Sequence, residues 1–575
     1  MPRDDFIIRI GGDTAIGGVI STGENFSLAA SRLGFRTFTF RTYPAEVKGG
    51  HAWYQVRISN RPVISIGDGC DVLMAFDQEA YELHKGDLNE GGVLVYDSDL
   101  VAPEDHKSVQ YGIPFQKIAR QELDFVRGTN TLIQRVLAGL FGLPLSSLEH
   151  MVKTRYQRRA DVMEKNLQAL AYGHDYTKQI QKEDGYWLGS ADNVARLVMS
   201  GNDAIVAGAL HAGCRYFAGY PITPASDILE TMARELPRLG GVALQAEDEM
   251  AALGSVFGAS YGGVKAMTAT SGPGFSLMIE LLGLCSMTET PIVLVDAQRS
   301  GPSTGMPTKL EQSDLFHALY AGHGDFPRIV VAPGSVEGCI GTTVLAFNLA
   351  EKYQCPAILL SDQSLSHRTE TIDAPDTAPF KVVERLRPNG VEPADYLRYE
   401  VTESGVSPMA VPGRDRHTYV AAGLEHDERG HPQLSQQVHE DMTAKRFRKL
   451  ANAGLEIDSP EFCPVFGSDK AEIGIISWGA TEGSALEAVE RALAKGYKVA
   501  ALHPRVLSPL PRAQIQEFID SVKKVVVAEV NYQGQLAHHL AANFGIQPIR
   551  LNKIGGLPFT PGEILAKIEE VAENA

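Results

Sequence analysis

The sequence predicts an α/β protein whose three α/β domains contain mainly parallel sheets. Short apolar runs alternate with amphipathic helical stretches along most of the chain, which is the pattern that strands and crossover helices produce. The 56 glycines and the hydrophobic content of 44% are typical of large α/β proteins with many tight strand–helix turns. At 575 residues the chain is too long for one hydrophobic core, so three domains are expected.

The first predicted domain covers residues 1–190. A strand at 6–10, a helix at 22–33 and a strand at 35–43 form a βαβ opening. The glycine-rich loop 11–18 is neither a Walker A motif nor G-x-G-x-x-G. It packs the helix start on the sheet, or it contacts a nucleotide or pyrophosphate at the helix N-terminus. Residues 150–190 are expected to be helical and then turn-rich, with turns at Gly173–Asp175 and Lys182–Gly185.

The second predicted domain covers residues 191–380 and alternates most regularly. Such alternation predicts a parallel sheet covered on both faces. Residues 381–465 show little periodicity and form a connecting segment, and residues 466–575 form a third α/β domain. The expected strands are 242–244, 264–268, 291–296, 329–331, 357–360, 473–478, 499–503 and 525–529, and the expected helices are 227–236, 248–260, 336–353, 482–494, 513–522 and 536–544.

Composition and charge exclude several classes of function. The net charge of −17 argues against nucleic acid and anionic membranes as partners. No apolar run reaches about 18 residues and no signal-peptide pattern opens the chain, so a cytoplasmic protein is expected. No C-x-x-C pair exists, which argues against an iron–sulfur cluster or zinc site made by this chain alone. The cysteines are expected to be free, mostly buried thiols in a reducing cytosol: Cys70, Cys214, Cys285, Cys339, Cys355 and Cys463.

The stretch from Gly219 to Thr308 contains the candidates for a functional site. It opens with Gly-Tyr-Pro-Ile-Thr-Pro at 219–224, directly before a helical pattern. The two prolines stiffen the backbone, so the Thr223 hydroxyl and nearby N–H groups are held at a helix start. Such a donor array suits a carboxylate. A proline-capped helix start without any ligand explains the same residues.

An acidic helix start follows, with Glu247, Asp248 and Glu249 in its first turn. Acidic residues are favourable at any helix N-terminus, and the alternative is that one of the three is a buried functional carboxylate. Beyond the next strand, Ser271–Gly274 forms a tight glycine loop, which lets a flat ring approach the backbone.

Arg299 follows the strand at 291–296 and begins the segment Arg-Ser-Gly-Pro-Ser-Thr-Gly-Met-Pro-Thr. Ligands of open parallel sheets bind beyond the carboxyl ends of the strands. Thr223, the Ser271 loop and Arg299 all follow such ends, so they are expected to converge on one site.

Taken in order, these motifs resemble the α subunit of 2-oxoacid:ferredoxin oxidoreductases. The resemblance continues through Gly423–Glu428 and Glu529–Leu536, and it covers most of the chain. The first 190 residues, with Lys48-Gly-Gly-His51, resemble the γ domain of that family, which is associated with coenzyme A. Residues 191–380 resemble a thiamine-pyrimidine-binding domain, and residues 466–575 resemble the C-terminal domain of transketolases. Within the family, the γ–α fusion is most similar to the enzymes for 2-oxoglutarate.

The resemblance implies roles for particular residues. Glu249 is expected to be the catalytic carboxyl group against the aminopyrimidine ring of thiamine diphosphate, with Glu247 as the alternative. Thr223 and Arg299 are expected to bind the substrate carboxylate beside the reacting carbonyl. The remaining expected cofactor contacts are Tyr220, Pro221, Ile222, Ser271 and Gly272.

A 2-oxoglutarate enzyme needs a further cation, because a second carboxylate buried without a partner costs several kcal/mol. The candidates in this chain are Lys48 and His51 in the γ-type domain and Lys309 after the Gly-Pro-Ser-Thr-Gly loop. Each is alternatively a solvated charge, and a residue of the β subunit is another source.

Two further motifs have plainer interpretations. Gly67-Asp68-Gly69 is similar to a magnesium motif of thiamine enzymes, but Asn89 follows too soon, so a turn before a strand at 72–76 is expected. His426 and Asp427 lack regular ligand spacing, so a surface loop or a subunit contact is expected there instead of a metal site.

The chain has no convincing diphosphate–magnesium motif and no cysteine pattern for an iron–sulfur cluster, which indicates a partner subunit. In the family, Mg²⁺ and the [4Fe-4S] cluster belong to a separate β subunit, and thiamine diphosphate is shared with it. The expected assembly is therefore an (αβ)₂ heterotetramer that passes electrons to ferredoxin. The expected reaction is the reversible oxidative decarboxylation of 2-oxoglutarate with coenzyme A to succinyl-CoA, as in the reductive tricarboxylic acid cycle. A pyruvate or branched-chain enzyme of the family and a non-catalytic, nucleotide-binding electron-transfer scaffold are the alternatives.

Overall fold

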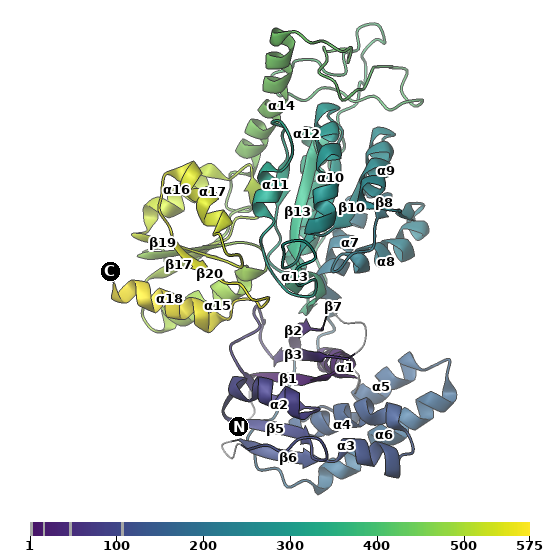
Figure 1. Cartoon of the computed structure of the whole chain (residues 1–575), viewed down its shortest axis with the longest axis vertical. Helices are drawn as coiled ribbons and strands as arrows, with labels where there is room; N and C mark the ends of the chain where they lie inside the picture. Colours follow the sequence, from purple (N-terminus) through teal and green to yellow (C-terminus); the bar gives the residue numbers. More distant parts are fainter. Residues whose placement is uncertain (1–3, 15–17, 45–48, 105–107, 575) are drawn as a thin grey trace. The chain divides into compact units, whose positions relative to one another are not determined.

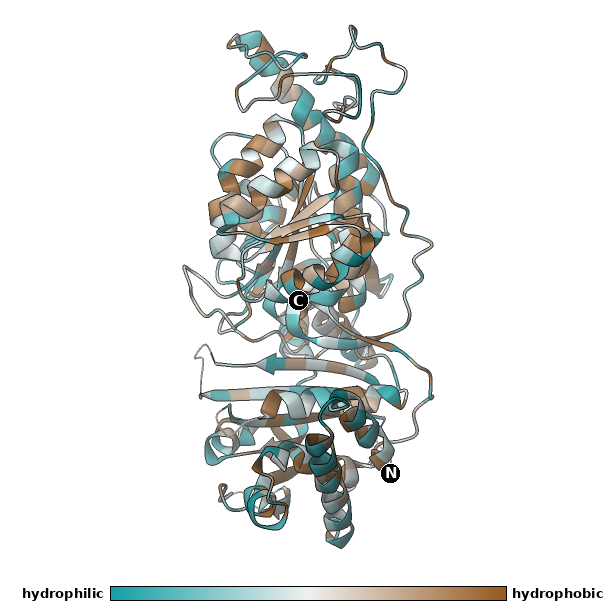
Figure 2. Ribbon diagram, turned by 90° about the vertical axis from the view of Figure 1, so that its right-hand side faces the viewer, coloured by the Kyte–Doolittle hydropathy of each residue, from teal (hydrophilic) through white to brown (hydrophobic). Residues whose placement is uncertain are grey.

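The computed structural model of the chain describes residues 4–14, 18–44, 49–104 and 108–574. It divides into two compact units (Figure 1). The first contains residues up to Met199 together with Arg368–Pro375, and the second contains Ser200–His367 and the chain from Asp376 onward. Hydrophobic residues predominate on the visible strands of the second unit, whereas hydrophobic and hydrophilic residues alternate along those of the first (Figure 2).

Among its described residues, the first unit contains one mixed sheet with the strand order β6-β5-β4-β1-β3-β2-β14-β7. Strands β1, β4, β5 and β6 are parallel to one another, whereas β3 is antiparallel to both β1 and β2. The strands are β1 (Asp5–Asp13), β2 (Arg36–Thr42), β3 (His51–Ser59), β4 (Cys70–Ala75), β5 (Leu88–Asp97), β6 (Val109–Ile113), β7 (Leu197–Ser200) and β14 (Thr369–Ile372). The helices are α1 (Val19–Arg32), α2 (Gln78–His84), α3 (Phe115–Lys117), α4 (Thr129–Phe141), α5 (Leu145–Arg155) and α6 (Ala160–Gln179).

This unit corrects three expectations. The βαβ opening is split, because β3 lies between β1 and β2. The turn expected around Gly173 is wrong, since Gly173 is a buried residue inside α6. The predicted domain 191–380 is interrupted, because Thr369–Ile372 pairs with β2 of the first sheet; Thr39 and Thr369 hydroxyls lie 2.9 Å apart across this pairing.

The second unit begins with a sheet in the order β18-β12-β13-β11-β10-β8-β9, counted over its described residues. Its strands from β12 to β9 are parallel, as the alternation predicted. The strands are β8 (Tyr216–Gly219), β9 (Val242–Gln245), β10 (Ala266–Thr270), β11 (Ile292–Gln298), β12 (Ile329–Val331), β13 (Pro356–Asp362) and β18 (Val506–Ser508). The helices are α7 (Gly201–His211), α8 (Ser226–Glu235), α9 (Glu249–Tyr261), α10 (Gly272–Met287), α11 (Leu315–Tyr320), α12 (Val336–Tyr353) and α13 (Gln363–His367).

Helices cover both faces of this sheet. Helices α9 and α10 pack on Leu294 and Ile292 of β11, whereas α12 packs with α7 and contacts β11 and β13. Figure 1 shows α10 and α9 side by side along β13 and β10. The central strands are therefore almost fully buried, which explains their continuous apolar sequences.

The carboxyl-terminal part of the second unit carries the order β15-β17-β16-β19-β20 over its described residues. Its strands are β15 (Val465–Gly467), β16 (Ile473–Ser477), β17 (Val499–Leu502), β19 (Lys524–Glu529) and β20 (Ile549–Asn552), and its helices are α15 (Glu482–Ala494), α16 (Arg512–Ser521), α17 (Gln535–Phe544) and α18 (Pro561–Glu573). Strand β18 leaves this domain and pairs with β12 of the larger sheet, so one core joins the two sheets.

The connecting segment 381–465 is not without regular structure. It contains α14 (Gln436–Ile457), a helix of 22 residues that the sequence analysis missed. The helix buries Lys445 and Lys449 against the carboxylate of Glu289, and the Lys445 Nζ–Glu289 Oε2 distance is 2.7 Å. Because this buried face is charged, the apolar periodicity that identifies most helices is weak here.

No helix in the described part of the chain is long and apolar enough to cross a membrane. All six cysteines are buried and none forms a disulfide, in agreement with the thiols expected from their spacing.

Candidate active site

The four predicted segments follow the carboxyl ends of four adjacent parallel strands. In the sheet order β11-β10-β8-β9, these ends lead to Arg299, Ser271, Tyr220 and the loop before Glu247. Since the strands are parallel neighbours, the four segments lie along one edge of the sheet. The convergence expected from the sequence is therefore present in the fold.

Arg299 joins two of these segments directly. Its Nη1 donates a hydrogen bond of 2.8 Å to the backbone carbonyl of Thr223. Only 8% of Arg299 is exposed, and its Nε has no hydrogen-bond partner among the described residues. Burial lowers the pKa of the guanidinium, and the nearby Asp314 opposes this effect. A buried guanidinium with an unused donor can bind a carboxylate.

The three acidic residues at the start of α9 lie in three different environments. Asp248 is the N-cap of α9, and its carboxylate accepts a hydrogen bond of 2.7 Å from the Ala251 N–H. Glu249 is buried, with 6% of its surface exposed, whereas Glu247 is exposed. Glu249 thus has the desolvated position expected for a functional carboxyl group, and Glu247 has the accessible one.

Two glycines of the Ser271–Gly274 loop allow carboxylate side chains of the same chain to pack against the backbone. A Cβ atom on Gly274 would lie 2.5 Å from Oε1 of Glu249, and one on Gly272 would lie 2.8 Å from Oδ2 of Asp314. Both acids therefore pack on the first turn of α10, where the helix dipole favours negative charge. Ser271 is the N-cap of α10, and its buried Oγ has no partner among the described residues.

Two acidic residues near this edge, one buried and one partly exposed, were missed by the sequence analysis. Asp296 lies in β11 and is fully buried, and burial with Asp314 nearby raises its pKa well above the usual range. Burial raises the pKa of Asp314 to about 6; Glu311 also raises it, and Arg299 lowers it. An aspartate inside the otherwise apolar run Ile292–Ala297 is the sequence signal that could have identified the first of them.

The remaining predicted cofactor contacts lie on the open side of this edge. Tyr220 is 41% exposed, Pro221 is exposed and Ile222 is intermediate. Further exposed hydrophobic side chains come from β9, α9 and α10: Val242, Leu244, Met250 and Leu277. Of these residues, Tyr220 and Met250 follow the carboxyl ends of β8 and β9, whereas Val242 is at the amino end of β9.

The three candidate cations for a second carboxylate have different surroundings. Lys309 is half-buried, its stem packs against Gly556, and burial lowers its pKa. His51 lies in the first unit, where its Nε2 is 2.9 Å from Nε2 of His84. Lys48 lies outside the described residues.

Among the described residues, no group of three or more histidine, cysteine, aspartate or glutamate side chains is arranged to hold a metal ion. At the Gly-Asp-Gly turn, a Cβ on Gly69 would lie 2.6 Å from Asn89 Oδ1, so Asn89 packs on the turn before β4. Nδ2 of Asn89 donates a hydrogen bond to Asp71 at 3.1 Å.

The loop expected around His426 is present and has exposed residues, but His426 itself points into the protein. His426 is fully buried, and its Nε2 lies 3.1 Å from the carbonyl oxygen of Met287 at the end of α10. The neighbouring Glu425 forms an ion pair of 2.6 Å with Arg446 of α14. The segment therefore links α14 to the end of α10.

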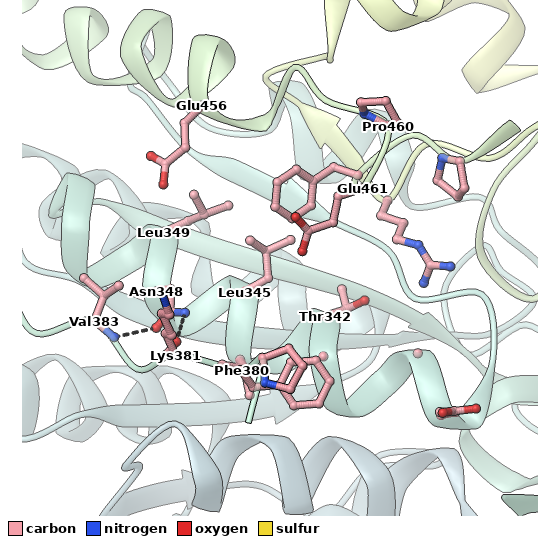
Figure 3. A pocket seen from close by; sticks show the side chains of 18 of the residues that line it. Thr342, Leu345, Asn348, Leu349, Phe380, Lys381, Val383, Glu456, Pro460 and Glu461 are labelled. Carbon is pink, nitrogen blue, oxygen red and sulfur yellow. Dashed lines mark hydrogen bonds between the residues drawn. The ribbon is translucent and has the colours of Figure 1, made fainter. Parts of the chain in front are cut away.

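A separate pocket has a volume of about 670 Å³ and is lined by residues of α12 and of the connecting segment. Figure 3 shows several of the side chains that line it. Leu345, Leu349 and Phe380 contribute apolar walls, and Lys352 pairs with Glu456 at 2.8 Å. None of the residues predicted from the sequence lines it.

Comparison with known families identifies three consecutive matches. Residues 207–445 match the model described as "Pyruvate flavodoxin/ferredoxin oxidoreductase, thiamine diP-bdg". Residues 8–176 match "Pyruvate ferredoxin/flavodoxin oxidoreductase", and residues 471–564 match "Pyruvate:ferredoxin oxidoreductase core domain II".

Individual relatives agree with these matches. The 2-oxoacid:ferredoxin oxidoreductase 2 subunit alpha of Aeropyrum pernix is 31% identical over 99% of this chain and 98% of its own length. The 2-oxoglutarate synthase subunit KorA of Methanothermobacter marburgensis is 42% identical over 64% of this chain and 97% of its own length. The solved 2-oxoglutarate:ferredoxin oxidoreductase of Magnetococcus marinus, with 2-oxoglutarate, coenzyme A and succinyl-CoA bound, is 42% identical, with a TM-score of 0.94 over 99% of both chains.

Proposed function

Because the chain belongs to the 2-oxoacid:ferredoxin oxidoreductases as a thiamine diphosphate-binding subunit, we propose that its substrate is 2-oxoglutarate. The proposed reaction is reversible oxidative decarboxylation with coenzyme A to succinyl-CoA and CO₂, with electrons passed to ferredoxin. The 42% identity to both the KorA subunit and the Magnetococcus marinus enzyme supports this choice among 2-oxo acids.

The observation that carries the proposal is the buried guanidinium of Arg299 at the end of β11. Its bond to the Thr223 carbonyl fixes its orientation, while Nε keeps a donor for a ligand. In this role Arg299 binds the carboxylate next to the reacting carbonyl, with Thr223 beside it. That carboxylate is common to all 2-oxo acids, so this contact binds the class without selecting a member.

The residues at the strand ends fit thiamine diphosphate. The buried Ser271 Oγ has no partner among the described residues, and the buried carboxyl group of Glu249 packs on Gly274 of the same loop. In the proposal Glu249 holds the proton shared with the aminopyrimidine ring, and Tyr220, Pro221, Ile222, Ser271 and Gly272 contact the cofactor. Bound thiamine diphosphate supplies the electron sink for decarboxylation.

Glu247 is the competing carboxyl group for the same role. It is exposed at the end of β9, where a partner subunit has access to it, whereas Glu249 is already packed against α10. The two assignments differ in one respect: Glu249 needs no partner to become desolvated, and Glu247 needs one.

Lys309 is the proposed cation for the second carboxylate of 2-oxoglutarate within the second unit. Burial lowers the pKa of Lys309 because it removes solvent from around the ammonium group. A bound carboxylate would compensate for that loss of solvation. His51, Lys48 or a residue of the partner supplies the cation if Lys309 does not.

A β subunit completes the proposed enzyme. It supplies Mg²⁺ and the [4Fe-4S] cluster and shares thiamine diphosphate in an (αβ)₂ assembly that reduces ferredoxin. The exposed hydrophobic side chains of Tyr220 and Met250 follow the strand ends at the site, which is where a subunit that shares the cofactor has to dock. The γ-type domain at 1–190 is the proposed coenzyme A-associated part.

The test is an assay of the assembled complex with coenzyme A and a low-potential electron acceptor. 2-Oxoglutarate, pyruvate, a branched-chain 2-oxo acid and 2-oxobutyrate are compared by kcat/KM. The proposal requires the highest value for 2-oxoglutarate. A preference for pyruvate or a branched-chain acid would reassign the substrate, and no turnover with any of them would support a non-catalytic scaffold.

A further inference from the structure

The residues directly after Lys309 are bound to the C-terminal domain at 466–575. The Leu310 N–H donates to the Gly556 carbonyl at 3.2 Å, and the Gln312 N–H donates to the Val530 carbonyl at 2.7 Å. The Leu310 side chain is 1% exposed and belongs to a hydrophobic cluster whose other described members all come from that domain. The chain after Lys309 is therefore fixed both through its backbone and through a buried side chain.

The residues before Lys309 form a loop that closes next to Arg299. The Ser300 N–H donates to the Lys309 carbonyl at 2.9 Å, and the Met306 N–H donates to the Ser300 carbonyl at 3.0 Å. The Lys309 N–H in turn donates to the Met306 carbonyl at 2.9 Å. Because Ser300 directly follows Arg299, the two proposed carboxylate-binding side chains begin at the two ends of one closed loop.

The aliphatic stem of Lys309 lies against the backbone of Gly556. A Cβ atom on Gly556 would lie 2.6, 3.0 and 3.2 Å from Cβ, Cγ and Cδ of Lys309. Gly556 has a φ of +83° and Gly555 a φ of +104°, so both adopt a backbone conformation that favours glycine. Their surroundings differ, because a Cβ on Gly555 would have no heavy atom within 4 Å. Of the two glycines, Gly556 is therefore the one whose missing side chain makes room for the lysine.

The loop that carries Gly556 is anchored at both ends. The Lys553 N–H donates to the carbonyl of Glu529, the last residue of β19, at 3.2 Å. Nζ of Lys553 donates to the Pro558 carbonyl at 2.9 Å and pairs with Glu563 of α18 at 2.7 Å. The support for the Lys309 stem is thus attached to two elements of the C-terminal domain.

The ammonium group of Lys309 has lost part of its solvation without gaining an acidic partner. Lys309 is half-buried, and burial is what lowers its pKa. In the described part of the chain, no acidic side chain forms an ion pair with it. Part of the desolvation cost of binding an anion is therefore already present in the free protein. Packing of the stem on Gly556 also reduces the number of rotamers that are lost on binding.

We propose that Gly556 is a positioning residue that adapts the site to dicarboxylic 2-oxo acids, because it holds Lys309 at a fixed place relative to Arg299. The inference rests on the proposed role of Lys309 as the cation for the second carboxylate. The C-terminal domain supplies no residue to the proposed chemistry. Through Gly556 it takes part in the selection of the substrate.

The experiment compares Gly556→Ala with Gly555→Ala in the assembled complex, using 2-oxoglutarate and 2-oxobutyrate. Gly556→Ala should raise KM for 2-oxoglutarate by roughly 10-fold to 100-fold, since displacing a binding group by about 1 Å can cost a factor of about 100. Its KM for 2-oxobutyrate and its kcat for both substrates should change little. Gly555→Ala is the matched control, because it introduces the same residue at positive φ without a contact to Lys309. It should change neither KM.

A double variant shows whether Gly556 acts through Lys309. Once Lys309→Met has removed the ammonium group, adding Gly556→Ala should cause no further loss of discrimination between the two substrates. The proposal is overturned if the two effects add, if Gly556→Ala affects both substrates equally, or if Gly555→Ala has the same selective effect.

Failure of this inference is distinguishable from failure of the proposed function. A selective loss in Lys309→Met without one in Gly556→Ala overturns the role of Gly556 alone. A Lys309→Met variant that loses no selectivity removes the proposed role of Lys309, and the inference with it. A complex that turns over no 2-oxo acid removes the proposed function itself.

A second measurement needs no substitution. In hydrogen–deuterium exchange of the wild-type complex, saturating 2-oxoglutarate should slow exchange in the peptide that contains Leu310, whose N–H donates to Gly556, and in the peptide that contains Gly556. Saturating 2-oxobutyrate should leave the Gly556 peptide unchanged, because it has no second carboxylate to fix Lys309. Equal exchange of the Gly556 peptide with the two substrates would overturn the proposal.

Discussion

At the scale of single residues, the site depends on which of two neighbouring carboxyl groups serves the cofactor. Glu249→Gln should preserve the fold and slow deprotonation at C2 of thiamine by about 10²–10⁴-fold, because the amide holds no transferable proton. Glu247→Gln is the matched control, since it removes the exposed acid from the same turn. Hydrogen–deuterium exchange at thiamine C2 in the assembled complex measures both. Normal exchange in Glu249→Gln and slow exchange in Glu247→Gln would move the role to Glu247.

Arg299 and Lys309 should separate the two carboxylates of the substrate. Arg299→Met is expected to raise KM, lower turnover, or both, for 2-oxoglutarate and 2-oxobutyrate alike. Lys309→Met should weaken 2-oxoglutarate by roughly 2–4 kcal/mol and leave 2-oxobutyrate nearly unchanged. Steady-state kinetics with both substrates provide the comparison. If Arg299→Met discriminates between the substrates, the two assignments are reversed, and if Lys309→Met affects neither, the cation comes from elsewhere.

At the scale of elements, the first turn of α10 tolerates no side chain where it meets Glu249. Gly274→Ala should destabilise the protein by about 1–3 kcal/mol, because the new Cβ would overlap with Thr270 Oγ1 and would lie 2.5 Å from Glu249 Oε1. Gly283→Ala in the same helix is the control, since its Cβ would meet only Phe326 at 3.9 Å. The midpoints of thermal unfolding of the two variants are compared. A Gly274→Ala variant as stable as Gly283→Ala would contradict the packing of Glu249 on this turn.

Helix α14 is attached through buried charge. Glu289→Gln leaves Lys445 and Lys449 without a counter-charge, and it should cost about 3–5 kcal/mol of stability. Glu472→Gln removes an exposed acid that also contacts two lysines, and it should change stability little. Thermal unfolding at neutral pH compares the two. Equal midpoints would show that the Glu289 cluster contributes no more than a surface pair.

The same cluster should make stability depend on pH. Burial lowers the pKa of Lys445 to about 7, so between that pH and the ordinary lysine pKa of about 10.5 the unfolded chain binds more protons. Stability contributed by this group therefore rises with pH across the interval. Lys445→Met should lose that rise, and the difference in unfolding midpoint between wild type and variant, measured from neutral to alkaline pH, tests it. A difference that does not vary with pH would contradict the lowered pKa.

At the scale of the whole molecule, the chain is expected to be one part of an enzyme. Purified alone, it should bind no iron, show no cluster absorbance and have no activity with any 2-oxo acid. The six cysteines are buried and separated in sequence, so they offer no set of cluster ligands. Iron analysis and visible absorption spectra of the isolated chain check this. Stoichiometric iron in the chain alone would contradict the assignment of the cluster to a β subunit.

Local sequence patterns were enough to predict most elements of the second unit. The predicted helices at 336–353 and 482–494 agree with α12 and α15 at both ends, and the strands of the parallel sheet agree within a few residues. Apolar periodicity indicates which side of a helix is buried, and strands that are covered on both faces stand out as continuous apolar runs. The strand ends, and with them the convergence of Thr223, Ser271 and Arg299, follow from the same pattern.

The tertiary structure decided what depends on residues distant in sequence. The apolar face of helix α14 is interrupted, because its buried lysines pair with Glu289, more than 150 residues earlier. Strand β14 joins the first sheet through β2, and the segment before Asp314 is held by residues 530–535. Burial of a charged group is favourable only when a partner from elsewhere in the chain compensates for it. The local sequence pattern does not identify that partner.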